Sequence, residues 1–377
     1  MLKKFTVSGF KAFKTPVTID FGATAAYEFS QECLDSEHNI VKDALIYGYN
    51  ASGKSSLALA LVDIVKNLSD NHVAQHKYIN YLNAENENGY AKFEYVFEFN
   101  GNIVEYNYKK SDYLTIIAES FSINGKSIIF YDKSTDQNAL ELNLAGTENL
   151  VRDLNQIKIS VLRYVKSNTV LPENTETETL NAFFEFVDRM LLFWSLEDRS
   201  FIGFTQISGV SLSDEIVKSG SFEKLQEFLR AAGINDEIIY KAVNEEYRLF
   251  FKFPNGKEID FSSSCSTGTS SLLLLFFWLQ NALNSKTGPS FIVIDEFDAF
   301  YHYELSRFII EELKKLKCQV VLTTHNTSLM TNSLLRPDCY YLLWRDYICN
   351  LTGLTDKELR FAHNIEKLYR GHEFERK

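Results

Sequence analysis

Apolar and polar residues alternate along this chain with two different periods. Short apolar runs stand between segments in which apolar residues recur every three or four positions. The first pattern is typical of buried strands and the second of helices that pack one face against a sheet. The predicted strands are 44–47, 291–294 and 319–323, and the predicted helices are 55–68, 270–283 and 304–316. Because strands and helices alternate, we expect a parallel sheet.

Other stretches alternate strictly between apolar and polar positions. Residues 2–21 predict two strands, and residues 91–131 predict several more. Two turn sequences typical of β-hairpins, Asn100-Gly101-Asn102 and Asn124-Gly125-Lys126, interrupt the second stretch. We therefore expect an antiparallel meander beside the parallel sheet. A further hairpin is predicted at 247–261.

Residues 138–245, between the meander and the predicted hairpin, form a region with helical periodicity. Its clearest helices are predicted at 180–192 and 222–232, and the polar run 173–178 is expected to form an exposed loop. It contains no long heptad repeat. The chain then divides into a first lobe with the meander, a helical insertion, and a second lobe, at 1–137, 138–246 and 247–377.

The composition is ordinary for a globular protein, with 45% hydrophobic and 24% charged residues among 377. A net charge of −11 argues against a nucleic-acid-binding domain, although a local basic strip is compatible with it. The longest apolar run, Leu272–Leu279, is far shorter than the ~20 residues of a membrane helix. The N-terminus has no apolar signal core, and the five cysteines lack metal-ligand spacing. We expect a cytoplasmic protein with free thiols and no membrane partner.

A glycine-rich loop lies between the predicted strand 44–47 and the predicted helix 55–68. It fits the pattern G-x-x-x-x-G-K-[ST], in which glycines let successive N–H groups point at phosphate oxygens. Lys54 is expected to reach the β- and γ-phosphates and Ser55 to bind Mg²⁺, with the dipole of the following helix adding to anion binding. The predicted nucleotide-binding residues are Gly48, Tyr49, Asn50, Ala51, Ser52, Gly53, Lys54, Ser55 and Ser56.

Two acidic residues, Asp295 and Glu296, end the predicted strand 291–294. A buried strand of this kind delivers carboxylates to the edge of the sheet where α/β sites lie. Beside a P-loop, Asp295 is expected to hold the Mg²⁺ shell and Glu296 to polarise the attacking water. Alone, such a pair is equally typical of a helix cap.

Two further features have both a functional and a structural interpretation. His325 follows the strand 319–323 and fits a sensor of the γ-phosphate, although a lone histidine after a strand is more often structural. Ser266, Thr267 and Gly268 precede the helix 270–283. Small hydroxyl and glycine residues at a helix start bind anions, and they are also ordinary N-caps.

The order of P-loop, serine–glycine signature, Asp-Glu strand and histidine resembles the ABC ATPase superfamily. Within it, the opening residues 5–13 are similar to the first strand of the RecF/SMC-like branch. The P-loop region 46–56, the run 295–298 and the segments 333–338 and 367–371 resemble bacterial ATPases related to OLD and abortive-infection proteins, such as the RloA and PARIS ATPase components. The likeness covers roughly 1–60 and 255–377, and the middle only in outline.

The resemblance implies an α/β fold of the ABC type, with a mixed central sheet, an antiparallel β subdomain and a helical insertion. It also implies ATP and Mg²⁺ as cofactors and a homodimer or higher homo-oligomer with ATP between subunits. Ser266 and Gly268 would then contact the γ-phosphate bound by another subunit. The signature lacks the second glycine and the glutamine of transporters, and no glutamine loop is evident, so we expect slow hydrolysis.

The same resemblance suggests a role in antiphage defence. Only 52 residues follow His325, fewer than the nuclease domain of OLD proteins needs, so we expect a separate effector nuclease or toxin and a phage protein as a trigger. The alternative is a RecF/SMC-like DNA-repair ATPase, for which nucleic-acid binding is an open question. A transporter ATPase is disfavoured by the N-terminal strand pattern and the irregular signature.

Overall fold

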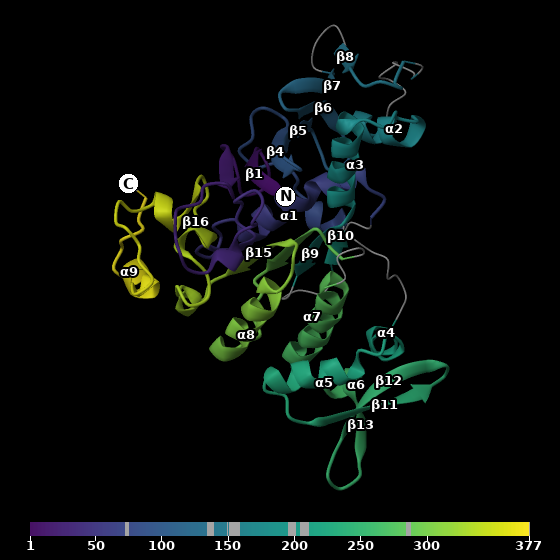
Figure 1. The fold of residues 1–377 in the computed structure, drawn as a ribbon, viewed down its shortest axis with the longest axis vertical. Coiled ribbons are helices and arrows are strands. Elements are labelled where there is room, and N and C mark those ends of the chain that lie inside the picture. Colours follow the sequence, from purple (N-terminus) through teal and green to yellow (C-terminus); the bar gives the residue numbers. More distant parts are fainter. Residues whose placement is uncertain are drawn as a thin grey trace.

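The computed structural model describes residues 1–71, 75–133, 139–148, 150, 159–194, 201–203, 211–283 and 288–376. The described strands form two seven-stranded sheets and one three-stranded sheet. Figure 1 shows the two large sheets as adjoining layers, with the small sheet at the far end of the molecule. No helix among the described residues is long and apolar enough to span a membrane.

The central sheet carries the predicted parallel strands. Its order is β10-β9-β14-β15-β3-β16-β17, and the inner strands from β9 to β16 run parallel. The outer strands β10 and β17 are antiparallel to their neighbours, so the sheet is mixed. Its members are β10 (Phe201–Gly203), β9 (Met190–Trp194), β14 (Phe291–Asp295), β15 (Gln319–Thr324), β3 (Asp43–Tyr47), β16 (Tyr340–Leu343) and β17 (Ile348–Asn350).

The second large sheet is antiparallel throughout, with the order β2-β1-β4-β5-β6-β7-β8. The two N-terminal strands therefore join the predicted meander, and β1 pairs with β4. Its members are β2 (Val17–Asp20), β1 (Leu2–Ser8), β4 (Ala91–Phe99), β5 (Asn102–Lys110), β6 (Ile116–Ile123), β7 (Lys126–Asp132) and β8 (Ala139–Leu142).

Helix α1 (Lys54–Leu68), which follows the P-loop, is almost entirely buried. It lies between the two large sheets, whereas α7 (Thr267–Leu283) and α8 (Tyr303–Lys314) lie on the other side of the central sheet (Figure 1). The hydroxyl of Tyr95 on β4 donates a hydrogen bond to the carbonyl of Ala60 at 2.8 Å. The P-loop helix is thus fixed to the antiparallel sheet as well as to the central one.

The middle region is less helical than predicted. It contains α2 (Val161–Asn168), α3 (Thr175–Asp188), α4 (Leu212–Lys218) and α5 (Phe222–Ala231), but also β8, β9, β10 and β11 (Glu237–Val243). The predicted helix 180–192 ends at Asp188, and β9 follows at once as a strand of the central sheet. The predicted loop 173–178 is wrong from Thr175 onward, because α3 begins there and Asn174 caps it by accepting a hydrogen bond from the Thr177 N–H.

The hairpin predicted at 247–261 is present. Strands β11, β12 (Glu246–Lys252) and β13 (Glu258–Asp260) form the small sheet, and the short helix α6 (Phe261–Ser264) follows it. The α/β class with a mixed central sheet and an antiparallel β subdomain is therefore confirmed. The division of the chain into three domains stays a prediction. All five cysteines are free thiols, and three of them are buried.

Candidate nucleotide-binding site

The P-loop is shaped by two glycines and by an unusual backbone. It connects the end of β3 at Tyr47 to the start of α1 at Lys54, with Gly53 as the N-cap. Gly53 has a φ of 106°, and a Cβ there would meet the Phe13 ring at 3.0 Å. A Cβ at Gly48 would collide with Ser52 Oγ. Only glycine fits both places, so the loop follows the tight path that a phosphate cradle requires.

Lys54 lies at the centre of the site. Its Nζ donates a hydrogen bond to the Gly48 carbonyl at 3.1 Å and lies 2.7 Å from His325 Nε2. Burial lowers the pKa of Lys54, while the nearby carboxylates of Glu296 and Asp295 oppose that effect. A cation that is poorly solvated and held by weak acceptors is well placed to bind an incoming phosphate oxygen.

The acidic pair follows β14 as predicted. Thr323 on β15 donates a hydrogen bond to Asp295 at 2.6 Å and accepts one from the Glu296 N–H at 2.8 Å. Burial raises the pKa of Asp295, and hydrogen bonds from Ser55 and Thr323 favour its carboxylate form. Glu296 has a φ of 47°, which is uncommon for a residue with a side chain and typical of constrained functional sites.

His325 and Glu296 face each other across the site. His325 Nε2 lies 3.3 Å from Glu296 Oε1, and both side chains remain partly exposed, at 39% and 28%. His325 therefore contacts both Lys54 and Glu296. These contacts place His325 in the site, and its role as a sensor of the γ-phosphate stays a prediction.

A cleft of about 500 Å³ opens beside these residues. This volume is within the range of about 300–1,000 Å³ typical of small-molecule sites. Its lining includes predicted site residues, namely Asn50, Ala51, Gly53, Lys54, Ser55, Ser56, Glu296 and His325. Of the other predicted P-loop residues, Ser52 is buried, while Gly48 and Tyr49 line a neighbouring cavity.

Six residues that line the cleft were not predicted as site residues. They come from three segments far apart in the chain, namely Lys11 and Ala12, Asn83 to Glu85, and Arg345. Asn83 donates a hydrogen bond to the Lys11 carbonyl at 2.6 Å, and Arg345 Nε donates one to the Ala51 carbonyl at 3.3 Å. Lys11 lies within the opening segment 5–13, but nothing local to Asn83 or Arg345 marks them as site residues.

The oxygen donors suit Mg²⁺ only together with a nucleotide. Ser55 and Asp295 are hydrogen-bonded, which places a hydroxyl and a carboxylate side by side. Among the described residues, no group of three or more His, Cys, Asp and Glu could hold a metal alone. Mg²⁺ commonly takes one or two protein oxygens and completes its shell with phosphate oxygens and water. The residues present fit that mode of binding.

The signature residues lie outside this cleft. Ser266 and Thr267 are exposed at the start of α7, beside α6 and at the end of α7 distant from the central sheet (Figure 1). Ser266 Oγ accepts a hydrogen bond from the Thr269 N–H at 3.1 Å. Ser266 therefore caps the N-terminus of α7, as the structural interpretation predicted. The structure therefore does not bring Ser266, Thr267 and Gly268 together with the P-loop of the same chain.

Comparison with known proteins gives a family. A family model described as "AAA domain, putative AbiEii toxin, Type IV TA system" matches residues 44–331, more than half of the chain. The match includes the P-loop, the acidic pair and His325. No curated protein matches the chain.

Solved structures give weaker likenesses. An SMC head domain from Thermotoga maritima is 17% identical, with a TM-score of 0.42, and 93% of this chain and 97% of that one are covered. The recombination mediator protein RecF of the RecFOR pathway, in a structure with ATPrS, is 15% identical, with a TM-score of 0.41, and 93% of this chain and 98% of that one are covered. These scores are too low to support any argument about this chain. On the family match, the chain belongs to the family of AAA domains described as putative AbiEii toxins of type IV toxin–antitoxin systems.

Proposed function

We propose that this protein binds ATP with Mg²⁺ and hydrolyses it. The observation that carries the proposal is the convergence of Lys54, Glu296 and His325, from three separate elements, at one end of a cleft lined by the P-loop. The family match to an AAA domain supports nucleotide binding. A cluster of charges that only stabilised the fold would not require the tight, glycine-containing P-loop beside it.

Each of these side chains has a distinct proposed task. Lys54 and the N–H groups at the start of α1 bind the phosphates, because both present positive charge to them. Glu296 accepts a proton from the attacking water and orients it. His325 donates a hydrogen bond to the γ-phosphate. The nearby carboxylate of Glu296 orients its ring. Bound Mg²⁺, next to Ser55 and Asp295, supplies charge neutralisation for the phosphates.

The test is ATPase activity in Glu296→Gln. This change keeps the size of the side chain and removes the proton acceptor, so the hydrolysis rate is expected to fall by at least ~10²-fold while ATP binding persists. Glu304→Gln, an exposed change at the start of α8, serves as the matched control and is expected to keep the wild-type rate. An unchanged rate in Glu296→Gln would remove this residue from catalysis.

We further infer that two subunits share each nucleotide site. Ser266 and Gly268 lie outside the cleft of their own chain, and they are accessible at the start of α7. A second copy in a head-to-tail arrangement would present them to the γ-phosphate, in the manner of ABC ATPases. ATP would then control assembly as well as fuel the reaction.

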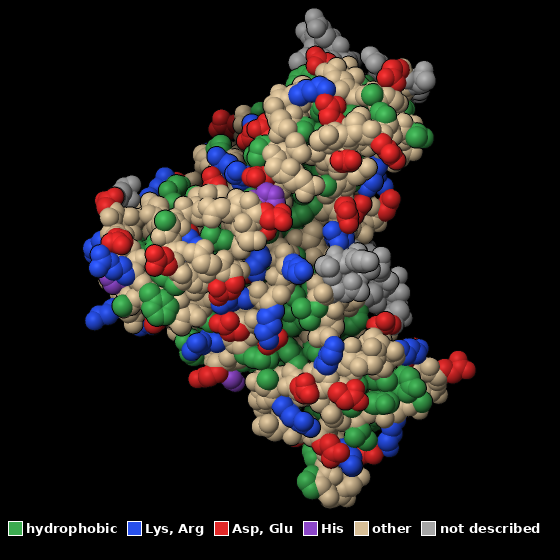
Figure 2. Space-filling model, viewed as in Figure 1, with side chains coloured by type: hydrophobic (Ala, Val, Ile, Leu, Met, Phe, Trp, Pro, Cys, Tyr) green, Lys and Arg blue, Asp and Glu red, His purple; other side chains and the backbone are tan. Residues whose placement is uncertain are grey.

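For the biological role, we propose an ATP-dependent sensor or scaffold in antiphage defence that controls a separate effector. The family description names a toxin of a toxin–antitoxin system, which supports a two-component arrangement with a partner protein. The alternative is a DNA-repair ATPase. On the face shown in Figure 2, Lys and Arg side chains are interspersed with Asp and Glu, and no basic strip runs across it. The net charge of −11 likewise argues against a DNA-binding role.

Co-purification with the product of the neighbouring gene distinguishes these two roles. The defence role predicts a stable or ATP-dependent complex, and loss of phage protection in Lys54→Ala. The repair role predicts DNA binding that weakens steeply with salt, because each phosphate contact releases counterions. Tight DNA binding by a protein that purifies alone would contradict the defence role.

A further inference from the structure

Arg345 places a guanidinium at the edge of the nucleotide cleft. It lies in the turn between β16 and β17, its side chain is exposed, and it lines the cleft together with Lys54 and Ser55. Its Nε donates a hydrogen bond to the Ala51 carbonyl at 3.3 Å. Among the described residues it forms no ion pair, so the chain does not compensate its charge.

The central sheet fixes the position of this turn. Strand β16 runs parallel to β3, with Leu342 opposite Tyr47, the residue that precedes the P-loop. The loops that follow neighbouring parallel strands lie at the same edge of a sheet, so the turn after β16 lies beside the P-loop. A hydrogen bond from the Trp344 N–H to the Tyr347 carbonyl at 2.8 Å closes the turn. Arg345 is therefore held on a short, closed turn next to the phosphate cradle.

One hydrogen bond attaches the guanidinium to the P-loop, and its remaining donors have no partner. A guanidinium has five N–H donors in a rigid planar fork, and only the Nε of Arg345 donates to a described residue. The four donors on Nη1 and Nη2 are left over. Donors arranged in this way bind phosphate oxygens in pairs, and these bonds are stronger than those between neutral groups.

The two carboxylates that line the cleft have other partners. Glu85 pairs with Lys14 at 3.0 Å. Glu296 lies 3.3 Å from His325. Neither carboxylate compensates Arg345, so an anion that does so has to come from outside the described part of the chain.

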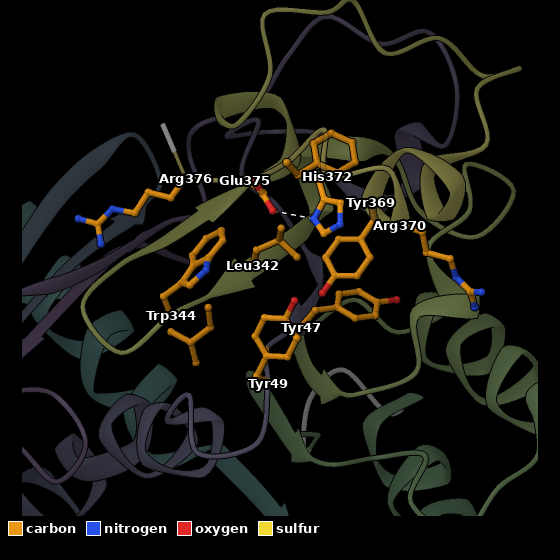
Figure 3. Close-up of a pocket in the computed structure, with 12 residues that line it drawn as sticks. Tyr47, Tyr49, Leu342, Trp344, Tyr369, Arg370, His372, Glu375 and Arg376 are labelled. Carbon is orange, nitrogen blue, oxygen red and sulfur yellow. Dashed lines mark ion pairs between the residues drawn. The ribbon is translucent and has the colours of Figure 1, made fainter.

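The residues on either side of Arg345 have other surroundings. Trp344 lines a separate cavity of about 430 Å³, which Figure 3 shows. Asp346 pairs with Arg376 at 2.7 Å, and Arg376 extends away from Tyr49 of the P-loop in the same view. Of the residues in this turn, all of which the structure describes, only Arg345 lines the nucleotide cleft.

We propose that Arg345 binds a phosphate group of the nucleotide held by the same chain. The P-loop beside it presents N–H groups to phosphate, and Arg345 adds a second cation to Lys54 from a different element, the turn after β16. A guanidinium that keeps its full charge suits the oxygens of a triphosphate. This inference rests on the proposed binding of ATP, because it concerns the same cleft.

A carboxylate of a second copy of the chain is the alternative partner for Arg345. Phosphate is favoured because the guanidinium already contacts Ala51, within the phosphate-binding loop. A carboxylate there would compete with the nucleotide for the same donors. The two interpretations differ in what a substitution affects, since one predicts weaker nucleotide binding and the other predicts weaker self-association.

The test is calorimetric titration of the Arg345→Gln protein with Mg²⁺ and either a non-hydrolysable ATP analogue or ADP. We expect affinity for the ATP analogue to fall about tenfold or more, because hydrogen bonds between a guanidinium and phosphate are lost. Arg345→Lys is expected to bind with intermediate affinity, since it keeps the charge and loses the fork. Arg360→Gln, an exposed arginine outside the cleft that pairs with Glu358, is the matched control and is expected to stay within about twofold of wild type.

The outcomes separate this inference from the proposed function. Weaker binding of the ATP analogue with unchanged binding of ADP would assign Arg345 to the terminal phosphate, and an equal loss for both would assign it to an inner one. Because the side chain is exposed, the unfolding midpoint of Arg345→Gln is expected to match that of wild type. Wild-type affinity for both nucleotides in Arg345→Gln, with or without weaker self-association, would overturn the inference alone. No binding of the analogue by wild-type protein would overturn the proposed function, and the inference with it.

Discussion

At the scale of single residues, the buried carboxyl of Asp43 stands out beside the P-loop strand. Asp43 begins β3 and is 5% exposed, with Lys42 Nζ at 2.8 Å. Burial raises its pKa to about 7, and the ion pair with Lys42 only partly offsets this effect. The folded protein therefore keeps a proton on Asp43 at pH values where the unfolded chain has released it, since an exposed Asp ionises near pH ~4.

This difference predicts a pH dependence of stability. The folded state binds more protons than the unfolded chain. The stabilisation that this gives is therefore greatest below the pKa of Asp43 in the unfolded chain, and it is lost as pH rises through about 7, the pKa of Asp43 in the folded protein. Between about pH 5 and pH 8, wild type should lose about 3 kcal/mol of unfolding free energy relative to Asp43→Asn. Urea denaturation of both proteins across this range measures it. Parallel pH profiles would show that Asp43 titrates normally.

At the scale of elements, a buried ion pair joins the P-loop helix to the antiparallel sheet. Lys110 on β5 lies 3.1 Å from Asp63 on α1, and both side chains are fully buried. The hydroxyls of Tyr81 and Tyr108 also donate hydrogen bonds to Asp63, at 3.0 and 2.9 Å. Burial lowers the pKa of Lys110, and Asp63 opposes that effect. The position of α1, and hence of the phosphate cradle, depends on this cluster.

Removing one member of the pair should be costly. Asp63→Leu leaves an unpaired buried ammonium and removes the acceptor that Tyr81 and Tyr108 use, so a loss of about 3–5 kcal/mol in unfolding free energy is expected. The double variant Asp63→Leu, Lys110→Met should recover part of this loss, because it removes the uncompensated charge. Chemical denaturation of the three proteins gives the comparison. A single variant as stable as wild type would mean that the pair does not hold α1 in place.

The elements around the site were predictable because their signals are local. The strand before the P-loop, the helix after it and the acidic strand each begin and end within one residue of the predicted positions. Strand β9 was missed because the apolar run 190–194 directly follows α3, and periodicity cannot distinguish a short buried strand from the last turns of a buried helix. Asn83 and Arg345 were missed because tertiary topology, not sequence spacing, brings them to the cleft.

At the scale of the whole molecule, the signature residues of the proposed site lie outside the nucleotide cleft of their own chain. The cleft is lined by the P-loop, Glu296 and His325, whereas Ser266 and Thr267 of the signature are exposed, and Gly268 is partly exposed, on a different part of the same chain. A monomer would therefore bind ATP without enclosing the γ-phosphate. In a head-to-tail dimer, each cleft would be closed by the signature of the other subunit, and hydrolysis would require both copies.

Mixing two inactive variants tests this central claim most directly. Lys54→Ala disables the P-loop and Ser266→Arg blocks the signature, so each variant alone should lack ATPase activity while keeping the wild-type unfolding midpoint. In an equal mixture, half of the dimers pair the two variants, and each such dimer has one site with both elements intact. The account predicts recovery of about a quarter of wild-type activity. No recovery above the separate variants, with mixed dimers shown to form, would contradict a site shared between subunits.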